Sequence, residues 1–161
     1  MFENIIKNVH NRHPLIHCIT NYVSINDCAN IVLACGGAPI MAEDINEVSQ
    51  ITSICQGLDI NIGMLNDNKL SSMLKAGATA NELGIPVILD PVGAGSSDYR
   101  IKAVQNLMSN VQFGVIRGNV SEIKAIAAKQ GIHNIAAGVY ETMQKNKSAM
   151  GVEAGIADKI T

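Results

Sequence analysis

The sequence has 161 residues, a net charge of -2, 47% hydrophobic residues and 16% charged residues, a balance typical of one soluble globular domain. The charge argues against a nucleic-acid-binding protein, because such proteins gain affinity from a basic excess that releases counterions. No apolar run approaches the roughly 18 to 20 residues of a membrane span, and the stretch "MFENIIKNVHNRHP" is too polar for a signal peptide. We therefore expect a cytoplasmic protein with no nucleic-acid partner and no membrane partner.

The cysteines and histidines do not predict a metal site or a disulfide. None of the four cysteines belongs to a C-x-x-C pair: they are Cys18, Cys28, Cys35 and Cys55. We expect them to stay reduced in the cytoplasm. Cys28 and Cys35 lie two helical turns apart on an apolar face, which favours small core residues. His13 and His17 have the spacing of a helical metal pair, but Pro14 and the alternation in "PLIHCIT" favour a strand instead.

Strands and helices are predicted to alternate along the chain, since stretches of helical periodicity are separated by short apolar runs. In chain order we predict a helix over 2–11, a strand over 15–19, a helix over 24–34, a strand over 38–41, a helix over 45–56, a strand over 58–62, a helix over 66–83, a strand over 86–90, a helix over 98–111, a strand over 113–117 and a helix over 121–128. Asn66 and Asp98 are the expected caps of two of these helices.

This rhythm predicts an α/β fold with a mainly parallel sheet covered by helices on both faces and joined by right-handed crossovers. In such folds ligands bind outside the carboxyl ends of the strands, where helix N-termini also point. The loops at these ends therefore hold the candidate functional residues. They are residues 20–21, 41–44, 61–66, 90–97 and 117–122.

The loop in "VILDPVGAGSS", residues 87–97, carries a carboxylate to the end of an apolar strand. Pro91 keeps Asp90 extended, and Gly93 and Gly95 would let a ligand approach the backbone closely. One interpretation is that Asp90 acts on a ligand. The alternative is that it only orders its own turn by accepting backbone N–H groups.

The stretch "IRGNVSEI" supplies a second polar cluster, with Arg117 at the end of a strand and Asn119 and Glu122 three residues apart at the start of a helix. The guanidinium fork of Arg117 matches a phosphate group. Asn119 and Glu122 fit a functional pair, and they equally fit a capping box that only closes the helix N-terminus.

Two carboxylates and an arginine at one sheet edge suggest a Mg²⁺-bound phosphate, because Mg²⁺ prefers one or two carboxylates together with phosphate oxygens and water. The sequence contains no G-x-x-x-x-G-K-[ST] loop and no G-x-G-x-x-G after a strand. A P-loop phosphotransferase and a Rossmann dinucleotide fold are therefore excluded.

Four stretches in combination resemble the hydroxyethylthiazole kinase family: "PLIHCITNYVSINDCANIVLACGGAPIMA", "NIGML", "GIPVILDPVGAG" and "GVIRGNVSEI". The resemblance covers about residues 14–128. It implies a three-layer ribokinase-like fold. It also implies transfer of the γ-phosphoryl group of ATP to the hydroxyl of 4-methyl-5-(2-hydroxyethyl)thiazole, a reaction of thiamine biosynthesis and salvage.

The resemblance also implies a thiazole pocket between the subunits of a homotrimer, formed near Asn21, Val23 and the main chain of Met41. A mostly apolar pocket suits this small, nearly neutral alcohol.

For the nucleotide, the resemblance implies contacts from Arg117 and Asn119. Asp90 and Glu122 match catalytic acidic groups near Mg²⁺, which they would meet through phosphate or water, with ATP as the co-substrate.

The resemblance fails over residues 129–150, which we interpret as a divergent or inserted segment with a peripheral helix around Ala136, Val139, Tyr140 and Met143. Family members continue for roughly another hundred residues, and that part would hold the glycine-rich anion hole and the adenine pocket. We therefore expect one domain over residues 1–161, the N-terminal part of a kinase with its C-terminal part missing, whose activity alone is in question. The alternatives are a ribokinase-like ATP-dependent hydrate dehydratase and a non-catalytic module that binds thiazole or forms trimers.

Overall fold

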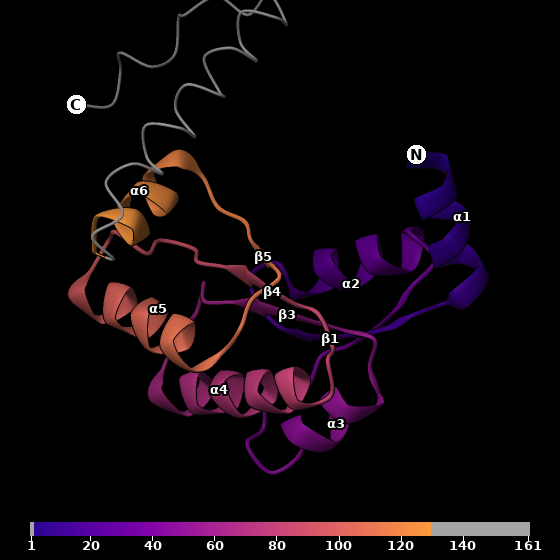
Figure 1. Ribbon diagram of the computed structural model, residues 1–161, viewed down its shortest axis with the longest axis horizontal. Helices are drawn as coiled ribbons and strands as arrows, with labels where there is room; N and C mark the ends of the chain where they lie inside the picture. The colour runs from indigo at the N-terminus through magenta and orange to yellow at the C-terminus, as the bar shows by residue number, and fades with distance from the viewer. Residues whose placement is uncertain (1, 130–161) are drawn as a thin grey trace, which may run out of the picture.

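The structure, a computed structural model, describes residues 2–129, and helices and strands alternate throughout them (Figure 1). The elements in chain order are α1 (Phe2–Arg12), β1 (Leu15–Ile19), α2 (Ile25–Ala34), β2 (Ala38–Ile40), α3 (Val48–Ile54), β3 (Gly57–Asn61), α4 (Asp67–Glu82), β4 (Val87–Asp90), α5 (Asp98–Asn110), β5 (Val115–Ile116) and α6 (Val120–Lys129). The predicted alternation is confirmed, element by element.

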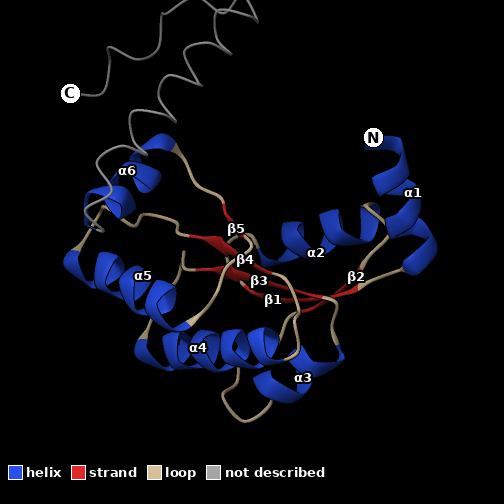
Figure 2. Ribbon diagram, viewed as in Figure 1, coloured by secondary structure: helices blue, strands red, loops and turns tan. Residues whose placement is uncertain are grey.

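The strands form one parallel sheet in the order β2-β1-β3-β4-β5. Figure 2 shows α2 on one side of the sheet and α3, α4 and α5 on the other, so the predicted α/β class with both faces covered is confirmed. The chain passes from β1 outward to β2 and then back to β3 on the other side of β1. The carboxyl ends of β1 and β3 therefore form the switch point at which ligands bind in open α/β sheets.

The hydrophobic core lies between the sheet and the helices α4 and α5. Its largest members are fully buried and include Ile60 and Leu89 from the strands and Met73 and Leu107 from the helices. Helix α4 approaches α5 closely at Gly77, where a Cβ would lie 2.5 Å from the side chain of Val111. This packing fixes strands β3 and β4, whose carboxyl ends lead into polar loops.

Helix boundaries differ from the predicted ones where a side chain gives the backbone another hydrogen-bond partner. Ser97, rather than Asp98, caps α5, because the Ser97 side chain accepts from the backbone N–H of Arg100 at 3.3 Å. Helix α3 begins at Val48, after Asp44 has formed a turn by accepting the N–H of Asn46 at 2.8 Å. Asn66 caps α4 as predicted.

The prediction that Cys28 and Cys35 are small core residues is wrong. None of the residues of α2 is buried: Cys28 is half-buried, and Cys35, the C-cap of the helix, is exposed. His17 is a buried structural residue whose ring is hydrogen-bonded to Thr52 Oγ1 at 2.9 Å and to the carbonyl of Ala42 at 2.8 Å.

Between residues 2 and 129, none of the helices is both long and apolar enough to cross a bilayer. The predicted helix around Ala136, Val139, Tyr140 and Met143 lies outside the described residues, as does the divergent segment after Lys129.

Asp59 is an acidic residue within the sheet, paired in register with Cys18 of β1 and Ile88 of β4. Burial raises its pKa to about 6, the nearby Asp90 carboxylate adds to the rise, and the Arg117 guanidinium opposes it. The folded state therefore holds the Asp59 proton more tightly than the unfolded chain does. This contribution to stability is complete below the unfolded pKa of about 4 and is lost as the pH rises through about 6.

We predict that Asp59→Asn stabilises the protein at about pH 8, because it removes a carboxylate that is charged and desolvated there. A shift of about two pKa units corresponds to roughly 3 kcal/mol at most. Urea unfolding at several pH values checks this, with Glu82→Gln, an exposed carboxylate on α4, as the control. The quantity to compare is the free energy of unfolding of Asp59→Asn minus that of wild type. A difference that is the same at about pH 8 as at about pH 4.5 would refute the prediction.

Candidate active site

A row of hydrogen-bonded side chains crosses the carboxyl ends of four strands. Asn21, just after β1, donates from Nδ2 to Asn61 Oδ1 at 3.1 Å. Asn61, the last residue of β3, donates from its own Nδ2 to Asp90 Oδ2 at 3.0 Å. Arg117, just after β5, donates to the same Asp90 oxygen at 2.9 Å. The row follows from the sheet, because parallel register sets Asn61 beside Asp90.

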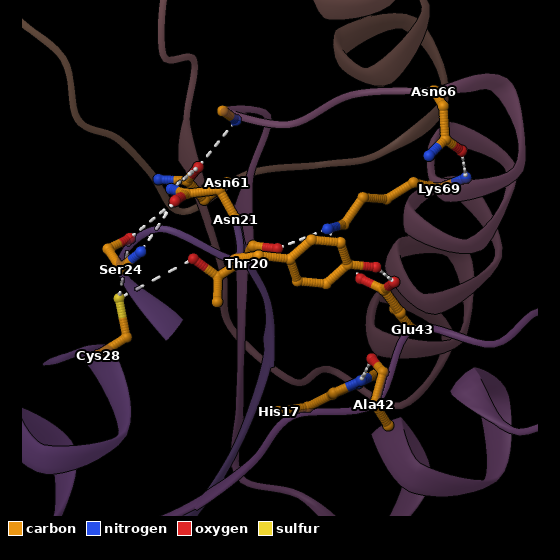
Figure 3. Close-up of polar contacts among 12 residues, drawn as sticks. His17, Thr20, Asn21, Ser24, Cys28, Ala42, Glu43, Asn61, Asn66 and Lys69 are labelled. Atoms are coloured by element: carbon orange, nitrogen blue, oxygen red, sulfur yellow. Dashed lines mark hydrogen bonds and ion pairs between the residues drawn. The ribbon is translucent and has the colours of Figure 1, made fainter. Parts of the chain in front are cut away.

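Asn21 is fixed by its own loop as well as by Asn61. Its Oδ1 accepts the backbone N–H of Ser24 at 3.0 Å and the Ser24 hydroxyl at 3.1 Å (Figure 3). Gly63 packs against this pair, and a Cβ there would lie 2.9 Å from both Asn21 Nδ2 and Asn61 Oδ1. In the "NIG" sequence of residues 61–63, Asn61 thus supplies the side-chain amide, and Gly63 leaves room for Asn21 in the loop after β1.

Asp90 contacts the neighbouring strand-end side chains. Burial raises its pKa, the Arg117 guanidinium opposes that rise, Glu122 adds to it, and the hydrogen bonds from Asn61 and Arg117 lower it. The Arg117 side chain is 76% exposed although it is ion-paired with Asp90. It can therefore present further N–H donors to an anionic ligand at the same edge.

Asn119 and Glu122 form a capping box, one of the two interpretations that the sequence left open for this pair. The N–H of Asn119 donates to Glu122 Oε2 at 2.8 Å, and the N–H of Glu122 donates to Asn119 Oδ1 at 3.0 Å. Glu122 Oε1 also accepts the N–H of Gly93 at 2.9 Å. Glu122 therefore ties the glycine-containing loop after β4 to the start of α6, which brings the loops of Asp90 and Arg117 together.

A cavity of about 550 Å³ lies between that loop and α6. Its lining combines small residues with polar ones: Gly93, Gly95, Ser96, Asn119, Ser121, Glu122, Lys124 and Ala125. The absence of side chains at the two glycines exposes backbone groups to any ligand that enters. Neither Asp90 nor Arg117 lines this cavity, but Gly93 and Asn119, which do, belong to the loops that follow them.

The predicted thiazole-binding residues lie on two adjacent loops. Val23, after β1, is 87% exposed, and Met41, after β2, is half-buried. The two loops meet where the Tyr22 hydroxyl donates to Glu43. The structure thus places Asn21, Val23 and Met41 on neighbouring loops, and their binding roles remain predictions.

The acidic residues fit Mg²⁺ only in an indirect way. Both carboxylate oxygens of Glu122 accept backbone N–H groups, and the two hydrogen bonds to Asp90 fall on Oδ2. Within residues 2–129 no three His, Cys, Asp or Glu side chains gather as a metal-binding group. The described side chains therefore offer no complete ligand set for Mg²⁺, and the predicted ion stays a prediction.

Three residues that the sequence did not single out also hold this edge together. Asn61 joins the two ends of the row, and its place at a strand end was the signal that could have identified it. Arg100 of α5 donates to the carbonyls of Ile62 at 2.6 Å, Gly63 at 2.7 Å and Val92 at 2.9 Å. The third is Lys69 of α4, which is buried. Neither cation has a sequence signal, because their partners are distant carbonyls and side chains.

Known proteins share the sequence and the fold of this chain. The model of the hydroxyethylthiazole kinase family matches residues 6–161. A curated hydroxyethylthiazole kinase from Clostridium acetobutylicum is 53% identical over 160 residues, which is 99% of this chain and 53% of that protein. Another from Alkaliphilus metalliredigens is 59% identical over 124 residues, which is 77% of this chain and 46% of that protein.

A solved structure of a hydroxyethylthiazole kinase protein from Pyrococcus horikoshii OT3 shares the fold. It has a TM-score of 0.77 and 40% sequence identity, over 80% of this chain and 50% of that one. The chain spans about half the length of the curated relatives it matches. Because the family model matches nearly the whole sequence, the chain belongs to the hydroxyethylthiazole kinase family.

Proposed function

We propose that the protein carries part of the active site of a phosphotransferase that moves the γ-phosphoryl group of ATP to the hydroxyl of 4-methyl-5-(2-hydroxyethyl)thiazole. The observation that carries the proposal is the row from Asn21 to Arg117, which links the predicted thiazole loop to the predicted nucleotide loop. Two substrates that must react need adjoining sites held in one geometry. Family membership supports this assignment of the two ends.

Arg117 and the loop after β4 form the proposed phosphate side. The exposed guanidinium of Arg117 would donate to phosphate oxygens, and Asp90 orients it through their 2.9 Å ion pair. Glu122 and Asn119 would shape the cavity beside them. Bound with ATP, Mg²⁺ would neutralise charge on the phosphates. The Asp90 carboxylate contacts both Arg117, on the phosphate side, and Asn61, next to the thiazole side. This position between the two substrates suits a catalytic role at the substrate hydroxyl.

Asn21, Val23 and Met41 form the proposed thiazole side. Val23 is a large apolar residue that is almost fully exposed, and a second subunit of a homotrimer would cover it and close the pocket. Such a closure would exclude water, which otherwise competes with the alcohol for the phosphoryl group. The use of ATP and the role in thiamine biosynthesis place the protein in the cytoplasm under this proposal.

The direct test is to incubate the protein with the thiazole alcohol, ATP and Mg²⁺ and to look for the phosphorylated alcohol by mass spectrometry. Product formation supports the proposal. Repair of hydrated nicotinamide cofactor, without thiazole phosphorylation, would instead favour the hydrate dehydratase. Calorimetric binding of the alcohol with no turnover, in a chain extended to the length of its relatives, would favour a non-catalytic module.

We predict that Arg117→Ala, made in a chain extended to the length of its relatives, raises the KM for ATP about tenfold to a hundredfold, because it removes charge-assisted hydrogen bonds to phosphate. The KM for the thiazole alcohol should change less than about twofold, since Arg117 lies at the far end of the row from Asn21. Steady-state kinetics with each substrate varied measures both values. Arg12→Ala, an exposed arginine in α1, is the control. Equal losses for the two substrates would count against the assignment of Arg117.

We predict that Asp90→Asn, in the same extended chain, lowers kcat about a hundredfold or more, because the charge is lost at the reacting centre. The fold should persist, since an amide can still accept from Asn61 and Arg117. Turnover measurements and thermal melting check the two statements together. Asp98→Asn, an exposed carboxylate at the start of α5, serves as the matched control. A variant that unfolds, rather than one that folds without turnover, would show that Asp90 is structural.

A further inference from the structure

Lys69 is a buried lysine in the first turns of α4, and only 4% of its surface is exposed. Lysine is seldom buried unless it is paired, because its charge loses hydration inside a protein. Asn66 caps the helix immediately before it, by accepting the N–H of Lys69 at 2.9 Å. The backbone of Lys69 is therefore fixed, and its side chain runs back toward the strand ends (Figure 3).

Three groups from two other loops surround the Lys69 ammonium group. It donates to the carbonyl of Thr20 at 2.5 Å and forms an ion pair with Glu43 Oε2 at 2.7 Å. It also lies 4.5 Å from the centre of the Tyr22 ring, within the range of a cation–π interaction. Tyr22 in turn donates its hydroxyl to Glu43. We call Lys69, Glu43 and Tyr22 the lysine clamp.

The lysine clamp joins loops that are otherwise linked mainly through the backbone of the sheet. Thr20 and Tyr22 flank Asn21 in the loop after β1, and Glu43 follows Met41 by two residues in the loop after β2. Although burial acts in the opposite direction, the hydrogen bonds from Lys69 and Tyr22 leave the pKa of Glu43 below its ordinary value. Glu43 is thus charged at neutral pH and holds both partners.

A second lysine on α4 provides a comparison. Lys75 donates to the carbonyl of Ile45, also in the loop after β2, at 2.9 Å, but it is exposed and makes this one hydrogen bond to that loop. An exposed contact of this kind contributes little, because water competes for it. Lys69, by contrast, is buried and engages both loops at once.

We propose that Lys69 is a positioning residue that holds the loops of Asn21, Val23 and Met41 in one arrangement, so that affinity for the thiazole alcohol depends on the lysine clamp. The inference rests on the proposed function for the identity of the ligand. It adds that the loops are set before the ligand binds, by a group that does not touch the reacting atoms. Preorganisation of this kind lowers the ordering cost of binding.

The ligand-free arm measures backbone hydrogen exchange in wild type, Lys69→Met and Lys75→Met. Methionine keeps most of the length of the lysine side chain without its charge. We expect Lys69→Met to speed exchange about tenfold or more over residues 20–24 and 41–47, and to leave residues 90–97 within about twofold. Lys75→Met should resemble wild type. Unchanged exchange in both loops, or equally faster exchange throughout the chain, would overturn the positioning role.

The ligand arm measures calorimetric affinity for 4-methyl-5-(2-hydroxyethyl)thiazole and for Mg²⁺–ATP. We expect Lys69→Met to weaken thiazole binding about tenfold, the scale of one lost charge-assisted contact, with ATP affinity nearly unchanged. Tyr22→Phe, which removes only the hydroxyl contact to Glu43, should have a smaller effect in the same direction. Thiazole affinity that is equal in Lys69→Met and wild type would refute the proposal.

The two arms separate this inference from the proposed function. If wild type binds no thiazole alcohol but Lys69→Met loosens only the two loops, the proposed substrate is wrong and the positioning role stands. If wild type binds the alcohol and Lys69→Met loses affinity for the alcohol and ATP alike, the claim that Lys69 positions only the thiazole-binding loops is wrong. A double variant, Lys69→Met with Glu43→Gln, also removes the charge of Glu43, whose side chain is 39% exposed and would otherwise lose its ion-pair partner. If the single variant unfolds, the double variant should fold and show the same faster exchange in the two loops; exchange like that of wild type would overturn the positioning role.

Discussion

The hydrogen bond between Asn61 and Asp90 is the contact on which the candidate site depends. It joins the last residues of two adjacent parallel strands, at 3.0 Å and in register. Asn61 also accepts from Asn21, and Asp90 also accepts from Arg117. A partly buried carboxylate that lacked these partners would be costly, so the row both satisfies Asp90 and aligns four loops. The site is therefore built on the rigid strand ends of the sheet.

Longer side chains then fix the loops beyond the strand ends. Arg100 holds the loops after β3 and β4 by their carbonyls, and Glu122 ties the loop after β4 to α6. Lys69 does the same for the loops after β1 and β2. Arg100 and Glu122 are satisfied by backbone groups, whereas Lys69 combines one backbone carbonyl with the Glu43 carboxylate and the Tyr22 ring. The contacts that order the loops therefore also offset the cost of burying charge. Such fixed loops suit a reaction between two bound substrates.

The sequence predicted the alternation of elements, the parallel sheet and the edge that carries the polar residues, because all three follow from local periodicity and strand ends. It also brought Asp90 and Arg117 to one edge. It did not separate the two readings of Asn119 and Glu122, since the same residues serve a cap and a ligand equally well. It missed Lys69 and wrongly placed Cys28 and Cys35 in the core, because burial depends on which other parts of the chain cover a helix.

The most direct test of the row as a binding site is an NMR titration of the protein with Mg²⁺–ATP and with the thiazole alcohol. The side-chain amide signals of Asn21 and Asn61 and the Nε–H signal of Arg117 report on it separately. We predict that Arg117 and Asn61 respond to the nucleotide and that Asn21 and Asn61 respond to the alcohol. Ligand-induced shifts elsewhere in the protein, with these three signals unmoved, would contradict the assignment of the row as the active site.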